Sequence, residues 1–374
     1  MNLIYNATLF YAAGQLRCGY KNVSLPRKKF LFKITMDSLT QIVLGAAVAE
    51  AVAGRKMGAK AALWGAIAGT IPDLDVFLTA FFHPIDAALM HRGFSHSMLF
   101  ALVAGPVLGW LVHRLYKKKY EQKTWIWLFF LGIITHPILD MFTNYGTEFL
   151  WPFNYRITFN TVFVIDPLYT VPFMICVLIA LFLKRDSYWR SRINWIGIYY
   201  SSAYLLWGVI VKLTILSDSK TYFSENGLKT RNAMVTPMPL TSFYWMVLVE
   251  DKTNYYVGYK SIFYPFNPND IDTIAKHKMP LNTLKWPETN YTKRLKFISN
   301  GYYTTERCGD TLKFHDLRFG LTSKLTNNRL KLPIMGFGMV IDKGIVKKTL
   351  RNRSSNLMKE LNFNVYVSKI FNRE

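Results

Sequence analysis

A series of long apolar segments constrains the fold of this chain more than any other feature. They lie between about residues 38 and 216 of the 374-residue sequence, and six can be drawn: 39–54, 61–82, 96–115, 124–142, 162–183 and 193–216. A segment of about 20 apolar residues is long enough to cross a bilayer as a helix. The first is the weakest, because it is short, rich in Ala and Gly, and contains Gln41 and Glu50. We therefore predict a mainly α, polytopic membrane helical bundle of five or six helices.

Basic residues alternate along the connections between these segments. Three connections are rich in Lys and Arg, at about residues 55–60, 114–123 and 184–192. The other two, about 83–95 and 143–161, each carry a single arginine. Because cytoplasmic loops of membrane proteins are enriched in Lys and Arg, we predict that the three basic loops face the cytoplasm. The opposite ends of the segments, and everything after residue 216, are then expected outside the cytoplasm.

The charge balance of the whole chain is strongly basic. Its 46 Lys and Arg residues outnumber 23 Asp and Glu residues, which gives a formal net charge of +23. Such a charge can indicate nucleic-acid binding. Many of these residues flank apolar segments, however, and they do not form one recognition helix. We therefore expect anionic membrane lipids as partners and no nucleic acid.

The two ends of the chain differ from its apolar part. Residues 1–35 are basic and do not resemble a standard signal peptide, since the charges follow a weakly apolar start. One interpretation is that Met36 is the true start of the protein; the alternative is a real amphipathic or disordered N-terminal arm. Residues 217–374 contain Tyr-, Phe- and Thr-rich stretches at 255–264, 302–305 and 312–319, separated by Gly, Asn and Pro. This pattern predicts a small β-rich or α+β extramembrane domain.

Three polar clusters lie near the same predicted ends of the apolar segments of residues 36–216. They are Pro-Asp-Leu-Asp at 72–75, His-Arg-Gly-Phe-Ser-His-Ser at 91–97 and His-Pro-Ile-Leu-Asp at 136–140. Ionisable side chains are costly inside a membrane and are functional candidates there. Since the predicted topology places all three clusters at one membrane face, we predict that they form one metal site. The three cysteines have no paired spacing, so nitrogen and oxygen ligands are expected.

Each cluster contains residue types that bind a divalent ion or an anion. His136 and Asp140 are four residues apart, so they project from one face of a helix. Asp73 and Asp75 would repel each other without a nearby cation. Taken alone, His136 and Asp140 could also be a hydrogen-bonded pair that stabilises the bundle. Asp73 and Asp75 could also be a solvated pair that ends a helix.

The cluster at 91–97 combines two histidines with an arginine and two hydroxyl groups. His91 and His96 offer nitrogen ligands to Zn²⁺. Arg92 is suited to hold a phosphate group, and Ser95 to cap the following helix, with Ser95 or Ser97 helping to orient an anion. The alternative for this cluster is a basic loop whose histidines contact lipid headgroups.

At these residues the chain resembles the YdjM-like family of bacterial inner-membrane proteins, described as membrane-bound metal-dependent hydrolases. The three clusters match the family pattern, and the match to the last cluster continues through Thr143, Gly146 and residues 150–152. Residues 36–41 also resemble the start of a family member. The resemblance covers about residues 36–216 and implies a multi-pass protein of the inner membrane. Many relatives have a histidine where this chain has Gln41, so the resemblance gives that position no ligand role. The family is distantly similar to zinc-dependent phospholipase C, which suggests phosphoester hydrolysis.

These observations predict an integral membrane hydrolase with a divalent-metal site at the outer membrane face. The expected ion is Zn²⁺. The metal ligands, direct or through a second residue, are expected to be Asp73, Asp75, His91, His96, His136 and Asp140. The residues expected to take part in catalysis are Asp73, Asp75, Arg92 and Ser95. The substrate class suggested by a site at headgroup level is a small-molecule or lipid-linked phosphoester. The alternatives are a non-catalytic transporter, an envelope assembly protein, or a purely structural metal site that anchors the C-terminal domain.

Overall fold

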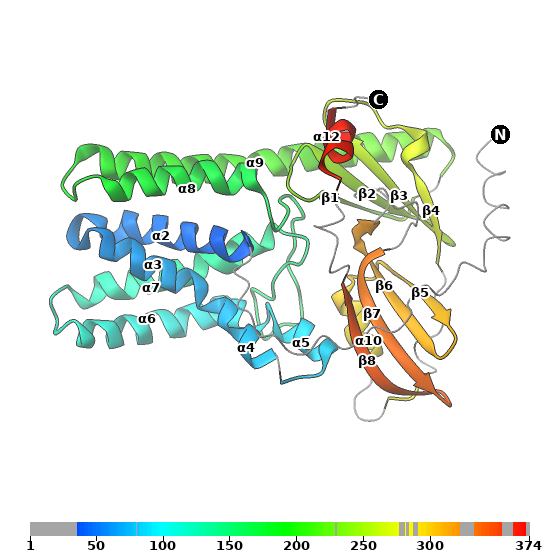
Figure 1. Ribbon diagram of the computed structural model, residues 1–374, viewed down its shortest axis with the longest axis horizontal. Helices are drawn as coiled ribbons and strands as arrows, with labels where there is room; N and C mark the ends of the chain where they lie inside the picture. The colour runs from blue at the N-terminus through cyan, green and yellow to red at the C-terminus, as the bar shows by residue number, and fades with distance from the viewer. Residues whose placement is uncertain are drawn as a thin grey trace.

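The computed structural model describes the chain from residue 36 to residue 371, apart from several short gaps. The gaps are residues 80, 229, 277–280, 282–283, 287–290, 322–332 and 354–361. Residues 1–35 lie outside the described residues. The two interpretations of this segment, a true start at Met36 or a real N-terminal arm, therefore stay predictions. A helical bundle forms one end of the molecule and two β-sheets form the other (Figure 1).

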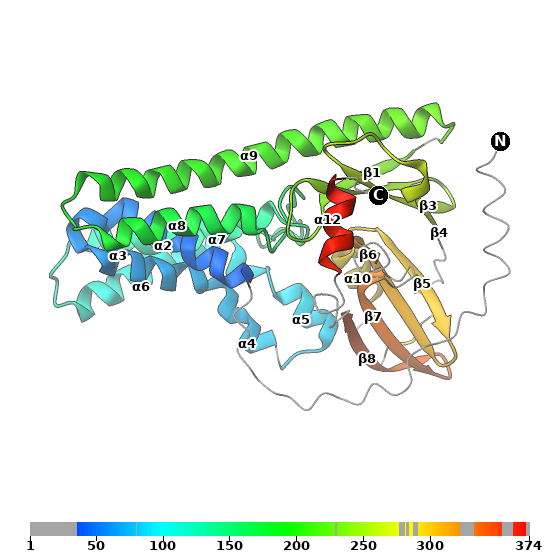
Figure 2. The ribbon, with the colours of Figure 1, turned by 45° about the horizontal axis from the view of Figure 1, so that its top comes forward.

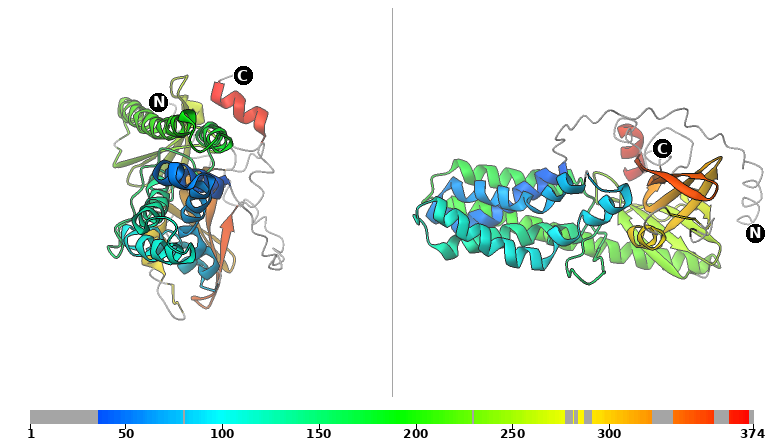
Figure 3. Two further views of the ribbon diagram at one scale, coloured as in Figure 1. Left: turned by 90° about the vertical axis from the view of Figure 1, so that its left-hand side faces the viewer. Right: turned by 90° about the horizontal axis from the view of Figure 1, so that it is seen from below.

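The bundle is built from long helices that run side by side (Figure 3). They are α2 (Met36–Met57), α3 (Ala59–Thr70), α6 (Met98–Leu115), α7 (Gln122–Met141), α8 (Pro167–Phe182) and α9 (Tyr188–Glu225). Short helices follow α3, namely η1 (Pro72–Leu74), α4 (Asp75–Thr79), α5 (Pro84–Met90) and η2 (Phe94–His96). Each apolar segment of the sequence therefore contains a helix, with ends that differ by several residues.

Fewer helices than the five or six that we predicted are long and apolar enough to qualify as membrane spans. Among the described residues, α6, α7 and α9 are long and apolar enough to cross a membrane. A fourth span results if α3 and the segment Pro72–Thr79 count as one, although they are bent by 44°. Helix α8 is a shorter apolar helix of 16 residues. The structure thus supports about three apolar candidate spans, and a count of five or six stays a prediction.

Small residues allow α2 and α3 to pack unusually closely. A Cβ atom on Gly65 would lie 2.2 Å from the Cβ atom of Ala49 and 2.2 Å from the carbonyl oxygen of Gly45. Small residues at helix interfaces in membranes permit such close backbone approach. The weak apolarity of the first segment therefore reflects its position inside the bundle, where α2 contacts α3, α7, α8 and α9.

Helix α9 connects the bundle to the C-terminal sheets (Figure 2). Its 38 residues correspond to a length of about 57 Å at 1.5 Å per residue, well beyond the apolar thickness of a bilayer. Val211, Ile215 and Phe223 of α9 pack in one core with Trp245 and Val247 of the first sheet. The last apolar segment, predicted at 193–216, is thus part of a longer helix whose second half supports the sheet.

Two four-stranded antiparallel sheets form the C-terminal part. The first, in strand order, contains β1 (Asn232–Pro237), β2 (Tyr244–Glu250), β3 (Asn254–Ser261) and β4 (Asp272–Ala275). The second contains β5 (Tyr303–Cys308), β6 (Thr311–Leu321), β7 (Pro333–Asp342) and β8 (Ile345–Arg353). Helices α10 (Thr292–Ile298) and α12 (Phe363–Phe371) accompany them. Met246 and Tyr259 of the first sheet share a core with Leu317 of the second, so the two sheets pack together.

The helix α5 attaches the second sheet to the bundle. Ile85 of α5 is fully buried in a core with Leu312 and Phe314 of β6. The carboxylate of Asp86 accepts a hydrogen bond from the Tyr291 hydroxyl and pairs with Arg294. The loop that follows the second apolar segment is therefore a docking element for the C-terminal domain.

Candidate metal centre

The three polar clusters of the sequence meet at the end of the bundle that faces the sheets. Asp73 lies in η1, at the bend that follows α3. His96 ends η2, immediately before α6, and His136 and Asp140 lie in the last turns of α7. Pro72 begins η1, and its missing N–H group favours the end of the preceding helix there. Three separate helix ends thus supply the polar side chains of one site.

Asp73, His96 and His136 form the centre of this cluster. Their ligand atoms all lie within 4.8 Å of one another. The two histidine Nε2 atoms are 3.2 Å apart. Asp73 Oδ1 lies 3.4 Å from Nε2 of His96 and 3.5 Å from Nε2 of His136. The imidazole rings are buried, whereas the Asp73 side chain is 27% exposed, so the cluster is open on the Asp73 side.

Asp140 brings a further carboxylate oxygen to the two histidines. Its Oδ2 lies 3.6 Å from Nε2 of His96 and 3.8 Å from Nε2 of His136. This oxygen is buried and also lies 3.2 Å from Nε of Arg92. Asp140 therefore places one oxygen near both histidine Nε2 atoms and near the Arg92 guanidinium.

The hydrogen bonds of the Nδ1 atoms define how the histidine rings are protonated. Nδ1 of His136 lies 2.6 Å from the carbonyl oxygen of Gly69, which can only accept, so His136 carries a proton on Nδ1. The Ser95 hydroxyl donates to Asp75 and therefore accepts from Nδ1 of His96 at 3.0 Å. Nε2 is then the atom of each ring that faces the cluster, as in histidines that bind metals.

The cluster therefore fits a divalent cation. Burial lowers the pKa of His96 to about 4, so this ring is neutral near pH 7. Two ring nitrogens and a carboxylate oxygen that face one another at this spacing need a proton or a cation between them. Ligand atoms of a four-coordinate zinc ion, with bonds of about 2.0–2.2 Å, lie about 3.3–3.6 Å apart. The separations of 3.2–3.6 Å among Asp73, His96, His136 and the Asp140–His96 pair match this spacing.

Asp75 and His91 lie beside the centre, behind Ser95. Asp75 Oδ1 is 2.8 Å from Nδ1 of His91, and Oδ2 accepts the hydrogen bond of Ser95 at 2.7 Å. Asp75 also lies 3.6 Å from Nδ1 of His96. The structure thus brings Asp75 and His91 to the site, but on the outer side of the His96 ring. Both were predicted as metal ligands, either direct or through a second residue, and their contacts suit the second of these roles.

Arg92 is buried and holds Asp140. Its Nε lies 3.2 Å from Asp140 Oδ2, and its Nη1 donates to Thr143 at 2.8 Å. The guanidinium also lies 4.9 Å from the centre of the Tyr145 ring. We predicted that Arg92 would hold a phosphate group of the substrate. The observed contacts suit positioning of Asp140, which the sequence did not indicate.

Ser95 is not the N-cap that we predicted. The side chain of Ser97 caps α6 by accepting the backbone N–H of Phe100 at 3.0 Å. The prediction was wrong because residues 94–96 form the short helix η2, which moves the start of α6 two residues along the chain. Ser95 is thereby released to link Asp75 with His96.

Three further residues take part in the site, although none of them was predicted as a ligand or a catalytic residue. Gln41 donates to Asp140 Oδ1 at 3.0 Å, so it positions this carboxylate. The carbonyl oxygen of Gly69 orients His136, and Thr143 links Arg92 to the backbone of Asp140. A backbone carbonyl leaves no signal in sequence, whereas Thr143 was part of the motif that follows His136.

The part of the chain that carries this cluster matches a known protein family. A family model described as "YdjM inner membrane protein" matches residues 36–217. This range contains all of the residues that form the cluster.

Residues 36–217 belong to the YdjM inner membrane protein family. The resemblance drawn from the sequence motifs is thereby confirmed, and the protein is a membrane protein whose family is named for the inner membrane. The uncharacterized protein YfhP of Bacillus subtilis (strain 168) is 26% identical over 140 residues, which is 35% of this chain and 42% of the relative. The inner membrane protein YbcI of Escherichia coli (strain K12) is 32% identical over 92 residues, 24% of this chain and 52% of the relative. The chain thus spans about half the length of the curated relatives it matches, and no solved structure matches it.

Proposed function

We propose that this protein is an integral membrane, metal-dependent hydrolase. One observation carries the proposal: the Nε2 atoms of His96 and His136 and the oxygen of Asp73 face one another at 3.2–3.5 Å, with both Nδ1 atoms engaged elsewhere. Asp73, His96 and His136 would hold the ion, and Asp140 would complete the set. Zn²⁺ is the proposed ion, because nitrogen and carboxylate ligands at this spacing suit it.

The residues around the centre fit hydrolytic chemistry. A zinc ion in such a site supplies Lewis acidity and activates water near neutral pH. A substrate group would approach from the side on which Asp73 is exposed. The Asp75–His91 pair can carry a proton away, since the His91 side chain is 37% exposed and its Nδ1 lies 2.8 Å from Asp75. Arg92 and Gln41 keep the Asp140 carboxylate in place.

A phosphoester, small or lipid-linked, is the proposed substrate class. Large apolar side chains are exposed on the segments that carry Asp75 and His96, among them Leu78, Phe81, Phe82 and Phe94. Side chains of this kind beside a polar opening suit contact with a lipid surface. We further propose that the chain crosses the membrane several times, with the metal centre and the C-terminal domain outside the cytoplasm. The basic connections at the other end of the bundle support this orientation.

The test combines metal analysis with an activity assay. The purified protein is prepared without chelators, and bound divalent metal is measured by mass spectrometry for wild type, His96→Gln and His136→Gln. His113→Gln is the matched control, because Nδ1 of His113 bonds to the carbonyl oxygen of Tyr120 at the far end of α6. We expect bound zinc in wild type and the control, and a loss of more than about tenfold in affinity in the two variants. The same proteins are assayed on phosphodiester and phospholipid substrates.

The results separate the proposal from its rivals. Hydrolysis that follows metal content across the four proteins would support the hydrolase. Metal retained by wild type without hydrolysis of any phosphoester would favour a structural site, a transporter or an assembly protein. Wild-type protein without bound divalent metal would contradict the metal centre itself.

A further inference from the structure

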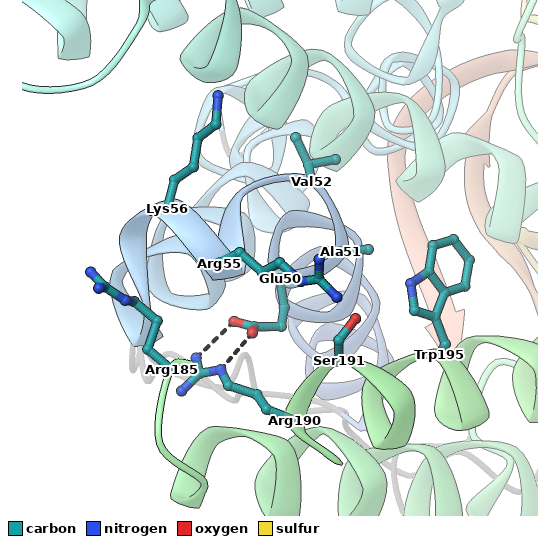
Figure 4. A pocket seen from close by; sticks show the side chains of 9 residues that line it. All are labelled: Glu50, Ala51, Val52, Arg55, Lys56, Arg185, Arg190, Ser191 and Trp195. Carbon is teal, nitrogen blue, oxygen red and sulfur yellow. Dashed lines mark hydrogen bonds and ion pairs between the residues drawn. The ribbon is translucent and has the colours of Figure 1, made fainter. Parts of the chain in front are cut away.

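A second polar site lies at the opposite end of the bundle from the metal centre. A pocket of about 390 Å³ is formed between the last turns of α2 and the start of α9 (Figure 4). Glu50, Arg55 and Lys56 contribute from α2, and Arg190, Ser191 and Trp195 from α9, with Arg185 from the connection before α9. None of these residues takes part in the metal cluster.

The floor of the pocket is a neutral, buried ion pair. Arg190 donates to both oxygens of Glu50, at 2.6 and 2.9 Å, and to the carbonyl oxygen of Leu183 at 2.9 Å. Gly54 leaves the space for this pair, since a Cβ atom there would lie 2.2 Å from the Glu50 carboxylate. Glu50 is therefore already neutralised and does not offset the charge of the other basic residues.

The rim of the pocket is positively charged, and nearby carboxylates of the chain offset this charge only weakly. Arg55, Lys56 and Arg185 are exposed. Lys56 pairs with Glu121 at 3.5 Å and Arg185 with the neighbouring Asp186 at 3.3 Å, and exposed pairs of this kind contribute little. No carboxylate of the described residues forms an ion pair with Arg55, whose side chain extends beside the Glu50–Arg190 pair in Figure 4. This rim is suited to an anion with several oxygen atoms.

The pocket continues into an apolar surface on the outside of α9. Trp195, at the edge of the pocket, is 41% exposed and stands 5.6 Å from the ring of Tyr199, which is itself exposed. Ile196 beside them is also exposed. Aromatic side chains of this kind mark the interface of a membrane, and basic pockets between helix ends bind lipid headgroups. A ligand with a phosphate group and an apolar tail matches both parts of the site.

We propose that this pocket binds the phosphate group of an anionic membrane lipid. Arg55 and Arg185 hold the phosphate oxygens, the Ser191 hydroxyl donates a further hydrogen bond, and Trp195 contacts the glycerol and the first acyl carbons. The Glu50–Arg190 pair joins α2 to α9 beneath the headgroup. The site is independent of the proposed hydrolase activity.

The test is a binding measurement on the full-length protein in detergent. Dioleoyl phosphatidylglycerol and dioleoyl phosphatidylcholine are titrated, and bound lipid is counted by native mass spectrometry. The double variant Arg55→Gln/Arg185→Gln is compared with Lys117→Gln/Lys118→Gln, which removes the same charge from the exposed loop after α6 at the same end of the bundle. We expect the pocket variant to raise the Kd for phosphatidylglycerol about tenfold or more, and the control less than about twofold. Trp195→Ala should also weaken phosphatidylglycerol binding.

Three outcomes would overturn the proposal. The pocket would not be a specific site if both double variants lost affinity equally or if phosphatidylcholine bound as tightly as phosphatidylglycerol. Inorganic phosphate and glycerol 3-phosphate are added as competitors to identify the source of the phosphate. Displacement of the lipid by either at a concentration near the lipid Kd would assign the pocket to a soluble anion instead.

Discussion

The Nε2 atoms of His96 and His136 lie 3.2 Å apart, although the two residues are 40 positions apart in the chain. The Nδ1 atom of each ring is bonded on the other side, to Ser95 and to the carbonyl oxygen of Gly69. Both rings therefore direct Nε2 at the same point, which also faces Asp73 and Asp140. A cation at this point would stabilise the arrangement.

Removal of metal should destabilise the wild-type protein. Binding to the folded state at about 100 times the Kd stabilises by about 2.7 kcal/mol, which corresponds to a Tm change of about 3–4 °C for a chain of this size. We expect a chelator to lower the Tm of wild type by about this amount and added Zn²⁺ to restore it. His96→Gln should show no response to either. The measurement is thermal unfolding in detergent, and a wild-type Tm that ignores the chelator would argue against the metal centre.

Asp75→Asn should weaken metal binding without removing a direct ligand. Asp75 accepts hydrogen bonds from Ser95 and His91 and thereby orients the His96 ring. Loss of such an outer partner typically costs about 10–100-fold in metal affinity. Zinc titration with a competing chelator measures the change. Asp86→Asn is the control, because Asp86 bonds to Tyr291 and Arg294 in the C-terminal domain. An equal loss of zinc affinity in Asp86→Asn would show that the loss comes from impaired folding and not from the orientation of His96.

The C-terminal domain should influence the metal centre through Tyr145. Its ring lies 4.9 Å from the Arg92 guanidinium and 4.7 Å from the ring of Phe319 in β6. A partly desolvated cation–π contact contributes about 1–2 kcal/mol, so Tyr145→Leu should lower zinc affinity about 5- to 30-fold by loosening Arg92 and Asp140. Tyr155→Leu, an exposed position in the same connection, should leave the affinity unchanged. Equal affinities for wild type and Tyr145→Leu would mean that the domain does not act on the centre by this route.

Gly65→Ala should destabilise the bundle. The added Cβ atom would lie 2.2 Å from both Ala49 Cβ and the carbonyl oxygen of Gly45, so α2 and α3 must move apart. Overpacking of this kind costs about 1–3 kcal/mol. Thermal unfolding should show a clear decrease in Tm, whereas Leu63→Ala, at an exposed position of the same helix, should cause a smaller one. A Tm of Gly65→Ala equal to that of wild type would contradict the close packing of these helices.

The strands of the C-terminal domain show where sequence patterns succeed. The stretches at 255–264, 302–305 and 312–319 contain or overlap β3, β5 and β6, because turns and aromatic residues mark them. β1 and β2 were not predicted. Residues 244–249 of β2 are all buried, since α9 covers one face of the sheet and the second sheet covers the other. A continuous apolar run of this kind has no alternation and cannot be distinguished from a helix by periodicity.

The sequence by itself determined the apolar helices, the basic ends, the family and the short list of polar residues that meet. These features are local, because hydropathy, charge and residue type can be read along the chain. The tertiary structure decided that His96, His136, Asp73 and Asp140 face one point. It also decided that Asp75 pairs with His96 and Arg92 with Asp140 from outside, while His91 pairs with Asp75. It also decided that Ser97 and not Ser95 caps α6. Which atom of a side chain faces which partner depends on helix bends and backbone carbonyls from distant segments, and these are set by packing in three dimensions.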